Sequence, residues 1–351
     1  MPTSNITGRL TRRMLLGAAA SLTAAPALAG ECRIGPAPHE KGPLVFMNYD
    51  QIELDASYTQ LEYEPTMAQI IARQASNSEA VRARIGQPRR VAYGPTEVER
   101  LDIYRTKRAK APIFVFIHGG SWLGGAAKDN AVPAEMFVTA GAHYIALDFI
   151  AVKAANGDIG VMAEQVRRAI AWVYKNAESF GGDRHRLYIG GHSSGGHLCG
   201  VALVTDWQKE FGIPANCIRG GLCMSGMYEM KPVRLSVRSS FVKFTDAMEQ
   251  AMSAIRQIDR LRAPITVTYG TFETPDFQRQ SRDFAAAVKA AGKSVTLIAA
   301  ANYAHVEMGE SLGNPYGPNG RAAHPRAGRC LREGERSEAD QGCRQCGGAG
   351  E

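Results

Sequence analysis

The sequence predicts an α/β protein in which a doubly wound, mainly parallel sheet carries helices on both faces. Short continuous apolar runs rich in β-branched and aromatic residues, such as 113–117 and 144–149, are typical of strands buried on both faces. Amphipathic stretches of helical length, such as 161–177, alternate with them, which favours right-handed crossovers. The chain has 351 residues, of which 45% are hydrophobic, enough for one large core.

Residues 1–29 have the features of a twin-arginine export signal. Arg12 and Arg13 precede an apolar stretch of small residues, 15–28, and the Ala27-Leu28-Ala29 triplet is an A-x-A cleavage site. An ordinary amphipathic first helix is the alternative. Cys32 lies two residues too late to carry a lipid. We therefore expect export to the periplasm by the Tat export machinery, and a catalytic domain over residues 30–323.

Charge and hydropathy exclude two classes of function. The formal net charge of +7 includes Arg9, Arg12 and Arg13 of the signal, and the remaining charges of both signs are interspersed, so no basic stripe indicates nucleic-acid binding. No apolar run reaches the roughly 18 residues that a membrane-spanning helix needs. The sequence predicts neither a nucleic-acid partner nor a membrane span.

The elements expected along the chain follow one another in a regular order. Helices over 58–85 should pack near the mouth of the site, and a mixed stretch over 230–262, helix-like over 244–258, could help to cover it. A helix should begin with Thr274 as its cap and Pro275 at its first position, and end at Gly292. The expected strands are 91–94, 101–104, 113–117, 144–149, 186–190, 218–225, 264–270 and 295–298, and the other helices are 161–177 and 198–204.

The stretch Gly191-His192-Ser193-Ser194-Gly195 matches the G-x-S-x-G nucleophile elbow. It lies between an expected strand and an expected helix, the context in which a serine side chain stands exposed at the end of a sheet. The sharp turn needs small residues on both sides of the serine, and the glycines supply them. Ser193 is therefore the candidate nucleophile.

A second glycine motif, His118-Gly119-Gly120-Ser121-Trp122, directly follows the buried strand 113–117. Two successive glycines allow close approach of the backbone to a substrate, so the N–H groups of Gly119 and Gly120, with that of Ser194, are predicted to form an oxyanion hole. A plain tight turn is the alternative. Trp122 and His192 are predicted to contact the substrate.

The base and the acid are expected in loops that follow later strands. His305 comes after the last strand, and Glu273 follows the strand before it, which gives the order serine, acid, histidine. Asp276, three residues after Glu273, remains the alternative acid, and a surface role remains the alternative for His305.

Three other histidines are candidate metal ligands. His118, His192 and His197 lie close to the two glycine motifs, but no acidic or cysteine partner completes a ligand set. We therefore predict no metal, and interpret these histidines as structural or pocket-lining.

The motifs H-G-G-S-W, G-H-S-S-G-G-H, E-T-P-D-F-Q-R-Q-S and N-Y-A-H-V-E-M resemble those of the kynurenine formamidase (arylformamidase) branch of the α/β-hydrolases. The resemblance covers roughly residues 45–322. It implies a serine esterase or amidase with no metal or organic cofactor, in which Ser193, Glu273 and His305 match the triad positions. The eukaryotic formamidases of this family carry Asp in a D-S-P-E-F context where this chain has Glu273. The export signal is a second departure and favours a carboxylesterase of exogenous small molecules.

These observations predict a serine hydrolase that cleaves a carboxylic ester, or an activated amide such as an N-formyl arylamine, through an acyl-enzyme. The alternatives are a true N-formylkynurenine formamidase and a catalytically silent small-molecule receptor with this fold.

The C-terminal segment, residues 324–351, has a different composition. It is rich in Arg, Gly, Glu and Cys, and we expect it to be disordered. Cys343 and Cys346, with Cys330 and His324, are of residue types that bind zinc, but their spacing does not support a zinc site.

Overall fold

A computed structural model describes residues 34–323 of the chain. The predicted export signal and the C-terminal segment 324–351 lie outside the described residues. Within residues 34–323, no helix is both long enough and apolar enough to cross a membrane.

The described residues form an eight-stranded sheet with the strand order β1-β2-β4-β3-β5-β6-β7-β8. The two pairings at one edge, β1 with β2 and β2 with β4, are antiparallel, and the other five pairings are parallel. The strands are β1 Arg89–Ala92, β2 Arg100–Tyr104, β3 Ala111–Ile117, β4 His143–Leu147, β5 Gly182–His192, β6 Ile218–Met224, β7 Ile265–Gly270 and β8 Val295–Ala300. The predicted doubly wound, mainly parallel sheet is confirmed.

The helices follow the strands in the expected alternation. The α-helices are α1 Gln51–Ser57, α2 Met67–Ile85, α3 Val132–Thr139, α4 Ile159–Asn176, α5 Ser194–Leu203, α6 Trp207–Phe211, α7 Met230–Leu235, α8 Asp246–Met252, α9 Pro275–Ala290, α10 His305–Glu310 and α11 Pro318–Ala323. The 3₁₀ helices are η1 Gln60–Glu62, η2 Ala127–Asn130, η3 Ala177–Phe180, η4 Val237–Ser240, η5 Ala254–Arg260 and η6 Ser311–Gly313.

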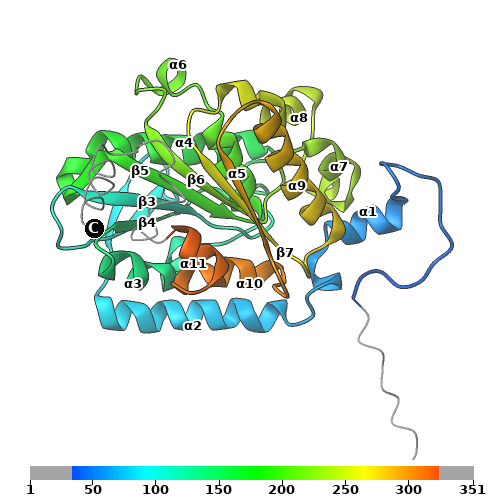
Figure 1. Ribbon diagram of the computed structural model, residues 1–351, viewed down its shortest axis with the longest axis horizontal. Helices are drawn as coiled ribbons and strands as arrows, with labels where there is room; N and C mark the ends of the chain where they lie inside the picture. The colour runs from blue at the N-terminus through cyan, green and yellow to red at the C-terminus, as the bar shows by residue number, and fades with distance from the viewer. Residues whose placement is uncertain (1–33, 324–351) are drawn as a thin grey trace, which may run out of the picture. The chain divides into compact units, whose positions relative to one another are not determined.

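Helices cover both faces of the sheet (Figure 1), and an apolar layer lies between each face and its helices. The larger layer packs side chains of α4, α5 and α9 against one face, and the smaller packs α3 and α11 against the other. All seven residues of β3 are buried, which explains its uninterrupted apolar run. Because the parallel strands all point the same way, their carboxyl ends meet at one edge of the sheet.

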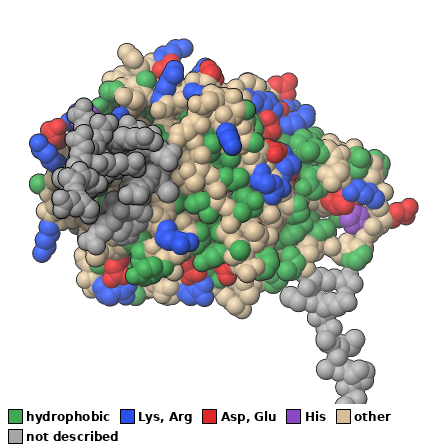
Figure 2. Space-filling view, viewed as in Figure 1, with side chains coloured by type: hydrophobic (Ala, Val, Ile, Leu, Met, Phe, Trp, Pro, Cys, Tyr) green, Lys and Arg blue, Asp and Glu red, His purple; other side chains and the backbone are tan. Residues whose placement is uncertain are grey.

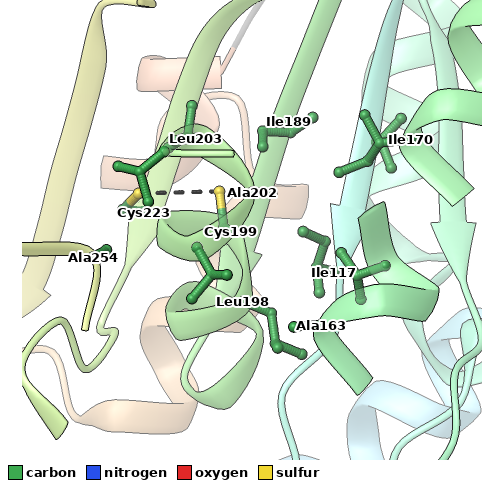
Figure 3. Packing of buried hydrophobic residues seen from close by; sticks show 14 of the residues in the cluster. Ile117, Ala163, Ile170, Ile189, Leu198, Cys199, Ala202, Leu203, Cys223 and Ala254 are labelled. Atoms are coloured by element: carbon green, nitrogen blue, oxygen red, sulfur yellow. Dashed lines mark hydrogen bonds between the residues drawn. The ribbon is translucent and has the colours of Figure 1, made fainter. Parts of the chain in front are cut away.

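Helix α5 anchors the turn that precedes it. Leu198, Cys199 and Ala202 of this helix pack with Ile117 of β3 and Ile189 of β5, all of them almost fully buried (Figure 3). The Sγ of Cys199 on the helix lies 4.0 Å from that of Cys223 on β6, and both thiols are free. The start of α5 is therefore held against the ends of two central strands.

One expected element has a different form. The stretch 244–258 is not one helix but α8 followed by η5, because Ser253 between them adopts extended angles of φ −88° and ψ 94°. Its Oγ accepts from the N–H of Met230 and donates to the carbonyl of Glu249, so it ties α8 to α7. This packing interrupts a pattern that reads as continuous in the sequence.

The surface of the face shown in Figure 2 carries basic and acidic side chains side by side among hydrophobic ones. No extended area of one charge is visible on that face. This distribution agrees with the interspersed charges of the sequence.

Candidate active site

The three predicted triad residues come from three different connections at the carboxyl edge of the sheet. Ser193 follows β5, Glu273 follows β7, and His305 is the first residue of α10, just after β8. The structure brings all three together, and each side chain is buried. The sequence separates them by as many as 112 residues.

Ser193 lies in a strained turn. Its φ of 59° and ψ of −124° are unusual for a residue with a side chain. A Cβ added to Gly191 would come within 2.1 Å of the Gly195 carbonyl oxygen, and one added to Gly195 within 2.1 Å of the Ile117 carbonyl oxygen. Glycine is therefore required on both sides of the serine, as the motif predicts.

A continuous hydrogen-bonded chain joins the three side chains. The Oγ of Ser193 lies 2.8 Å from Nε2 of His305, and Nδ1 of His305 lies 3.0 Å from Oε2 of Glu273. The other carboxylate oxygen of Glu273 accepts from Oγ of Ser225 and from the N–H of Gly270, each at 2.6 Å. Because Glu273 accepts at both oxygens, the proton of a neutral His305 belongs on Nδ1, which leaves Nε2 free to accept from Ser193.

Burial sets the charge state of this group. It lowers the pKa of His305, and the nearby Arg238 lowers the same pKa further. Burial raises the pKa of Glu273, while its hydrogen bonds from Ser225 and Gly270 act in the opposite direction. A neutral imidazole next to the serine is the protonation state that a general base requires.

Asp276, the alternative acid, lies in a different network. It is fully buried at the start of α9, where it accepts hydrogen bonds from Tyr58 and from Nε of Arg279, the latter at 2.7 Å. Gln280 donates to the Tyr58 hydroxyl at 2.8 Å. Of the two candidate acids, only Glu273 contacts His305.

The H-G-G loop packs directly against the nucleophile turn. A Cβ added to Gly119 would lie 3.0 Å from Cβ of Ser193, and Gly120 has a φ of +116° that favours glycine. The N–H groups of Gly119, Gly120 and Ser194 have no protein acceptor within residues 34–323. Free N–H groups beside a nucleophilic serine are the arrangement that an oxyanion hole requires.

A cavity of about 730 Å³ opens over the serine. Its wall contains Ser193, His305 and the glycine loop, together with side chains of η1, α2 and η4. The predictions that 58–85 lies at the mouth and that 230–262 helps to cover it are confirmed. Among the residues of the wall are Tyr58, Leu61, Met67, Ile71, Phe116, Leu123, Val237, Arg238 and Phe241.

The prediction that Trp122 contacts substrate is corrected by the structure. Trp122 is 1% exposed and is absent from the cavity wall, although its neighbours Ser121 and Leu123 belong to it. Positive φ angles at Ser121 and Trp122 redirect the chain, and the indole packs edge-on against His197 with ring centres 5.2 Å apart. Trp122 supports the site from beneath.

The other histidines near the motifs are separate structural groups. His192 lies in the cavity wall, as predicted, and its Nε2 bonds the His305 carbonyl at 2.8 Å. His118 stacks on Phe149, and Nε2 of His197 bonds the Met252 carbonyl at 3.1 Å. Burial lowers the pKa of His192 to about 3 and that of His197 to about 4.

The described residues contain one group with the spacing of metal ligands, formed by His39, Asp50 and Glu53. Asp50 and Glu53 form the capping box of α1, and His39 bonds Asp50 at 2.8 Å. These side chains do not line the cavity over Ser193. Their contacts indicate a helix cap.

Sequence reasoning missed three side chains that support the site. Ser225, which bonds Glu273, follows β6 with a φ of +50°. Glu64 is buried and accepts from the Val306 N–H at 2.8 Å, immediately after His305. Arg238 lies in the cavity wall. None of them belongs to a local motif, and a single sequence holds no signal that would have found them.

Comparisons with known proteins agree with this geometry. The BD-FAE family model matches residues 101–220. Kynurenine formamidase of Danio rerio is 27% identical over 279 residues, and the match covers 76% of this chain and 92% of that protein. Esterase LipC of Mycobacterium tuberculosis is 26% identical over 228 residues, and the match covers 59% of this chain and 56% of that protein. A crystal structure of a putative thioesterase from Silicibacter sp. TM1040 superposes with a TM-score of 0.66 at 21% identity, covering 75% of this chain and 96% of that one. The chain has the α/β-hydrolase fold.

Proposed function

We propose that this chain, which has the α/β-hydrolase fold and is similar to kynurenine formamidases and esterases, is a serine hydrolase of small molecules. It cleaves a carboxylic ester, or an activated amide such as an N-formyl arylamine, through an acyl-enzyme. The observation that carries the proposal is the chain of contacts from Ser193 through His305 to Glu273, beside three backbone N–H groups that have no acceptor in the part of the chain that the structure describes.

The geometry supports an acyl-transfer sequence in two halves. Ser193 Oγ attacks the substrate carbonyl while Nε2 of His305 accepts its proton. Glu273 accepts the hydrogen bond from Nδ1 and stabilises the imidazolium, and the N–H groups of Gly119, Gly120 and Ser194 stabilise the oxyanion. The imidazolium then protonates the leaving alcohol or amine. In the second half, His305 takes a proton from the water that attacks the acyl-enzyme. The imidazolium then returns this proton to Ser193 Oγ as the bond between Oγ and the acyl group breaks and the acid leaves.

One experiment separates this proposal from the receptor alternative. A fluorophosphonate probe should label the wild-type protein in a 1:1 ratio and should not label Ser193→Ala. p-Nitrophenyl butyrate should be hydrolysed with burst kinetics by the wild type only. Absence of both labelling and turnover would favour a silent receptor.

A true N-formylkynurenine formamidase is a second candidate. It is favoured by the similarity that spans 92% of the Danio rerio kynurenine formamidase. Comparison of kcat/KM for N-formylkynurenine and p-nitrophenyl butyrate on one preparation decides between the two. A value for N-formylkynurenine higher by tenfold or more would assign the formamidase activity, and the reverse would assign a carboxylesterase.

We also propose that the enzyme acts in the periplasm after Tat export. The support is the sequence of residues 1–29, with its paired arginines and A-x-A site. In a bacterial host, the wild type should appear in the periplasmic fraction as a shortened chain. An Arg12→Lys, Arg13→Lys double variant should remain in the cytoplasm at full length, and equal periplasmic levels of the two proteins would exclude this route.

A further inference from the structure

Arg238 is a buried cation in the wall of the active-site cavity. It lies in η4, on the stretch between β6 and β7, and is 2% exposed. Its guanidinium carbon lies 5.3 Å from the ring centre of Trp122 and 6.0 Å from that of Tyr58. Aromatic rings on two sides hold the guanidinium in place.

No carboxylate neutralises this guanidinium within residues 34–323. Its nearest acceptors are the carbonyl oxygens of Tyr58, 3.2 Å from Nη2, and Ser121, 3.5 Å from Nη1, and its Nε has no acceptor. Arg279 shows the contrast, since it is also largely buried but pairs with two aspartates at 2.7 Å. A guanidinium has five N–H donors, so most of those of Arg238 have no acceptor among the described residues.

The guanidinium nevertheless keeps its charge. Burial lowers the pKa of Arg238 only to about 10, so the side chain is protonated at neutral pH. A buried charge without an opposite charge is costly, and buried charges in proteins are as a rule paired.

The remaining ionisable groups of the wall do not neutralise it. Asp129 and Glu310 are partly exposed, so water screens their charges, and Glu310 is already paired with Arg73 at 2.6 Å. The histidines of the wall, His192 and His305 among them, have lowered pKa values and are neutral. All residues of the cavity wall belong to the described part of the chain. Among them, Arg238 is the one buried side chain that carries a charge at neutral pH.

We propose that Arg238 binds an anionic group of the substrate, so that the enzyme prefers esters or activated amides that carry a carboxylate. This inference rests on the proposed serine hydrolase activity. Nη1 of Arg238 lies 3.5 Å from the carbonyl oxygen of Ser121, the residue after the predicted oxyanion glycines, so the guanidinium lies beside the loop that is predicted to bind the scissile carbonyl. A carboxylate accepts two parallel hydrogen bonds from one guanidinium, which gives orientation as well as attraction.

The first test compares charged and neutral substrates of equal shape on the wild-type enzyme. Mono-p-nitrophenyl adipate is paired with the p-nitrophenyl ester of adipic acid monoamide, which places the charge on the acyl side. 4-Acetoxybenzoate is paired with 4-acetoxybenzamide, which places it on the leaving group. Each kcat/KM is divided by the rate of hydroxide-catalysed hydrolysis. We expect the carboxylate to be preferred by about 10- to 100-fold in at least one pair, the range of a charged hydrogen bond. No preference in either pair would overturn the proposal.

The second test changes the residue. Arg238→Met removes the charge and keeps an unbranched apolar stem, and Arg238→Lys keeps the charge without the bidentate geometry. The carboxylate preference should disappear in Arg238→Met and persist in part in Arg238→Lys, with folding checked by melting temperature. A preference that survives in a folded Arg238→Met protein would assign recognition to another group. If all four substrates are untouched and fluorophosphonate does not label the wild type, the serine hydrolase assignment itself fails.

Discussion

Replacing Glu273 by Gln should disable the base while leaving the fold in place. The Gln oxygen can still accept from Ser225 and Gly270, each 2.6 Å from the oxygen that it replaces. The amide nitrogen then faces Nδ1 of His305, and because that amide can only donate, Nδ1 must accept and the ring proton moves to Nε2. Nε2 therefore donates toward Ser193 and is unable to take its proton.

The size of the effect follows from this change of tautomer. The equivalent change of carboxylate to amide in serine proteases lowers kcat about 10⁴-fold. We expect a loss of about 10³- to 10⁴-fold, or roughly 4 to 5.5 kcal/mol of transition-state stabilisation. The measurement is kcat for p-nitrophenyl butyrate, with active sites counted by fluorophosphonate titration of the wild type.

Asp276→Asn is the matched control. It removes a carboxylate three residues away that pairs with Arg279 at 2.7 Å and accepts from the Tyr58 hydroxyl. Breaking this buried pair should reduce the free energy of unfolding by about 3 kcal/mol, because it leaves Arg279 with only the half-exposed carboxylate of Asp283 as an ionic partner. Its kcat should remain within about tenfold of the wild type. The reverse pattern, with an active Glu273→Gln and an inactive but folded Asp276→Asn, would refute the reasoning.

Three further predictions concern groups around the triad. Gly195→Ala should lower the melting temperature, because its Cβ would lie 2.1 Å from a carbonyl oxygen, whereas Gly124→Ala, with nothing within 4 Å, should not. Ser225→Ala removes the hydrogen bond to Glu273 and should lower kcat about tenfold in steady-state assays. An unchanged kcat would contradict the view that Ser225 supports catalysis through Glu273. Burial raises the pKa of Glu64 from 4.5 to about 7, so its contribution to stability is present below pH 4.5 and is lost as pH rises toward 7. Denaturant titrations should therefore find Glu64→Gln more stable than the wild type at pH 8, by up to about 3 kcal/mol, and no such gain in stability at pH 4. Equal differences in stability at both pH values would show that the effect does not come from the titration of Glu64.

The parts of the fold and site that the sequence predicts are those encoded locally. The strand β3 is recognisable because burial on both faces leaves seven consecutive buried residues, six of them apolar side chains beside one proline. Ser193 and the glycines around it are recognisable because the sharp turn admits almost no other residues. His305 follows from chain order, since the last parallel strand delivers the next loop to the same edge of the sheet. Their catalytic roles stay predictions until the variants are assayed.

The error at Trp122 has a physical cause that sequence order conceals. Its position beside the H-G-G motif favours a side chain in the pocket. Residues with positive φ reverse the side on which neighbouring side chains fall, and both Ser121 and Trp122 adopt such angles. The loop thus places Leu123 in the cavity wall and the indole beneath it. A pattern of residue types does not reveal this angle when neither residue is glycine.

Contacts between distant segments of the chain also decide how buried charges are stabilised at the site. They explain why the Glu273 carboxylate and the Arg238 guanidinium differ in the number of protein groups that stabilise their charges. Burial raises the free energy of the Glu273 carboxylate, but Ser225 Oγ and the Gly270 N–H offset this by donating to it. Burial acts on Arg238 as well, and the contacts of its guanidinium with other polar or aromatic groups of residues 34–323 are two carbonyl oxygens and two aromatic rings. Glu273 thus has hydrogen-bond donors at both oxygens, which offset part of the cost of its burial, whereas Arg238 has no carboxylate partner within residues 34–323. A partner for Arg238 must come from the cavity side, which is the side from which the substrate enters.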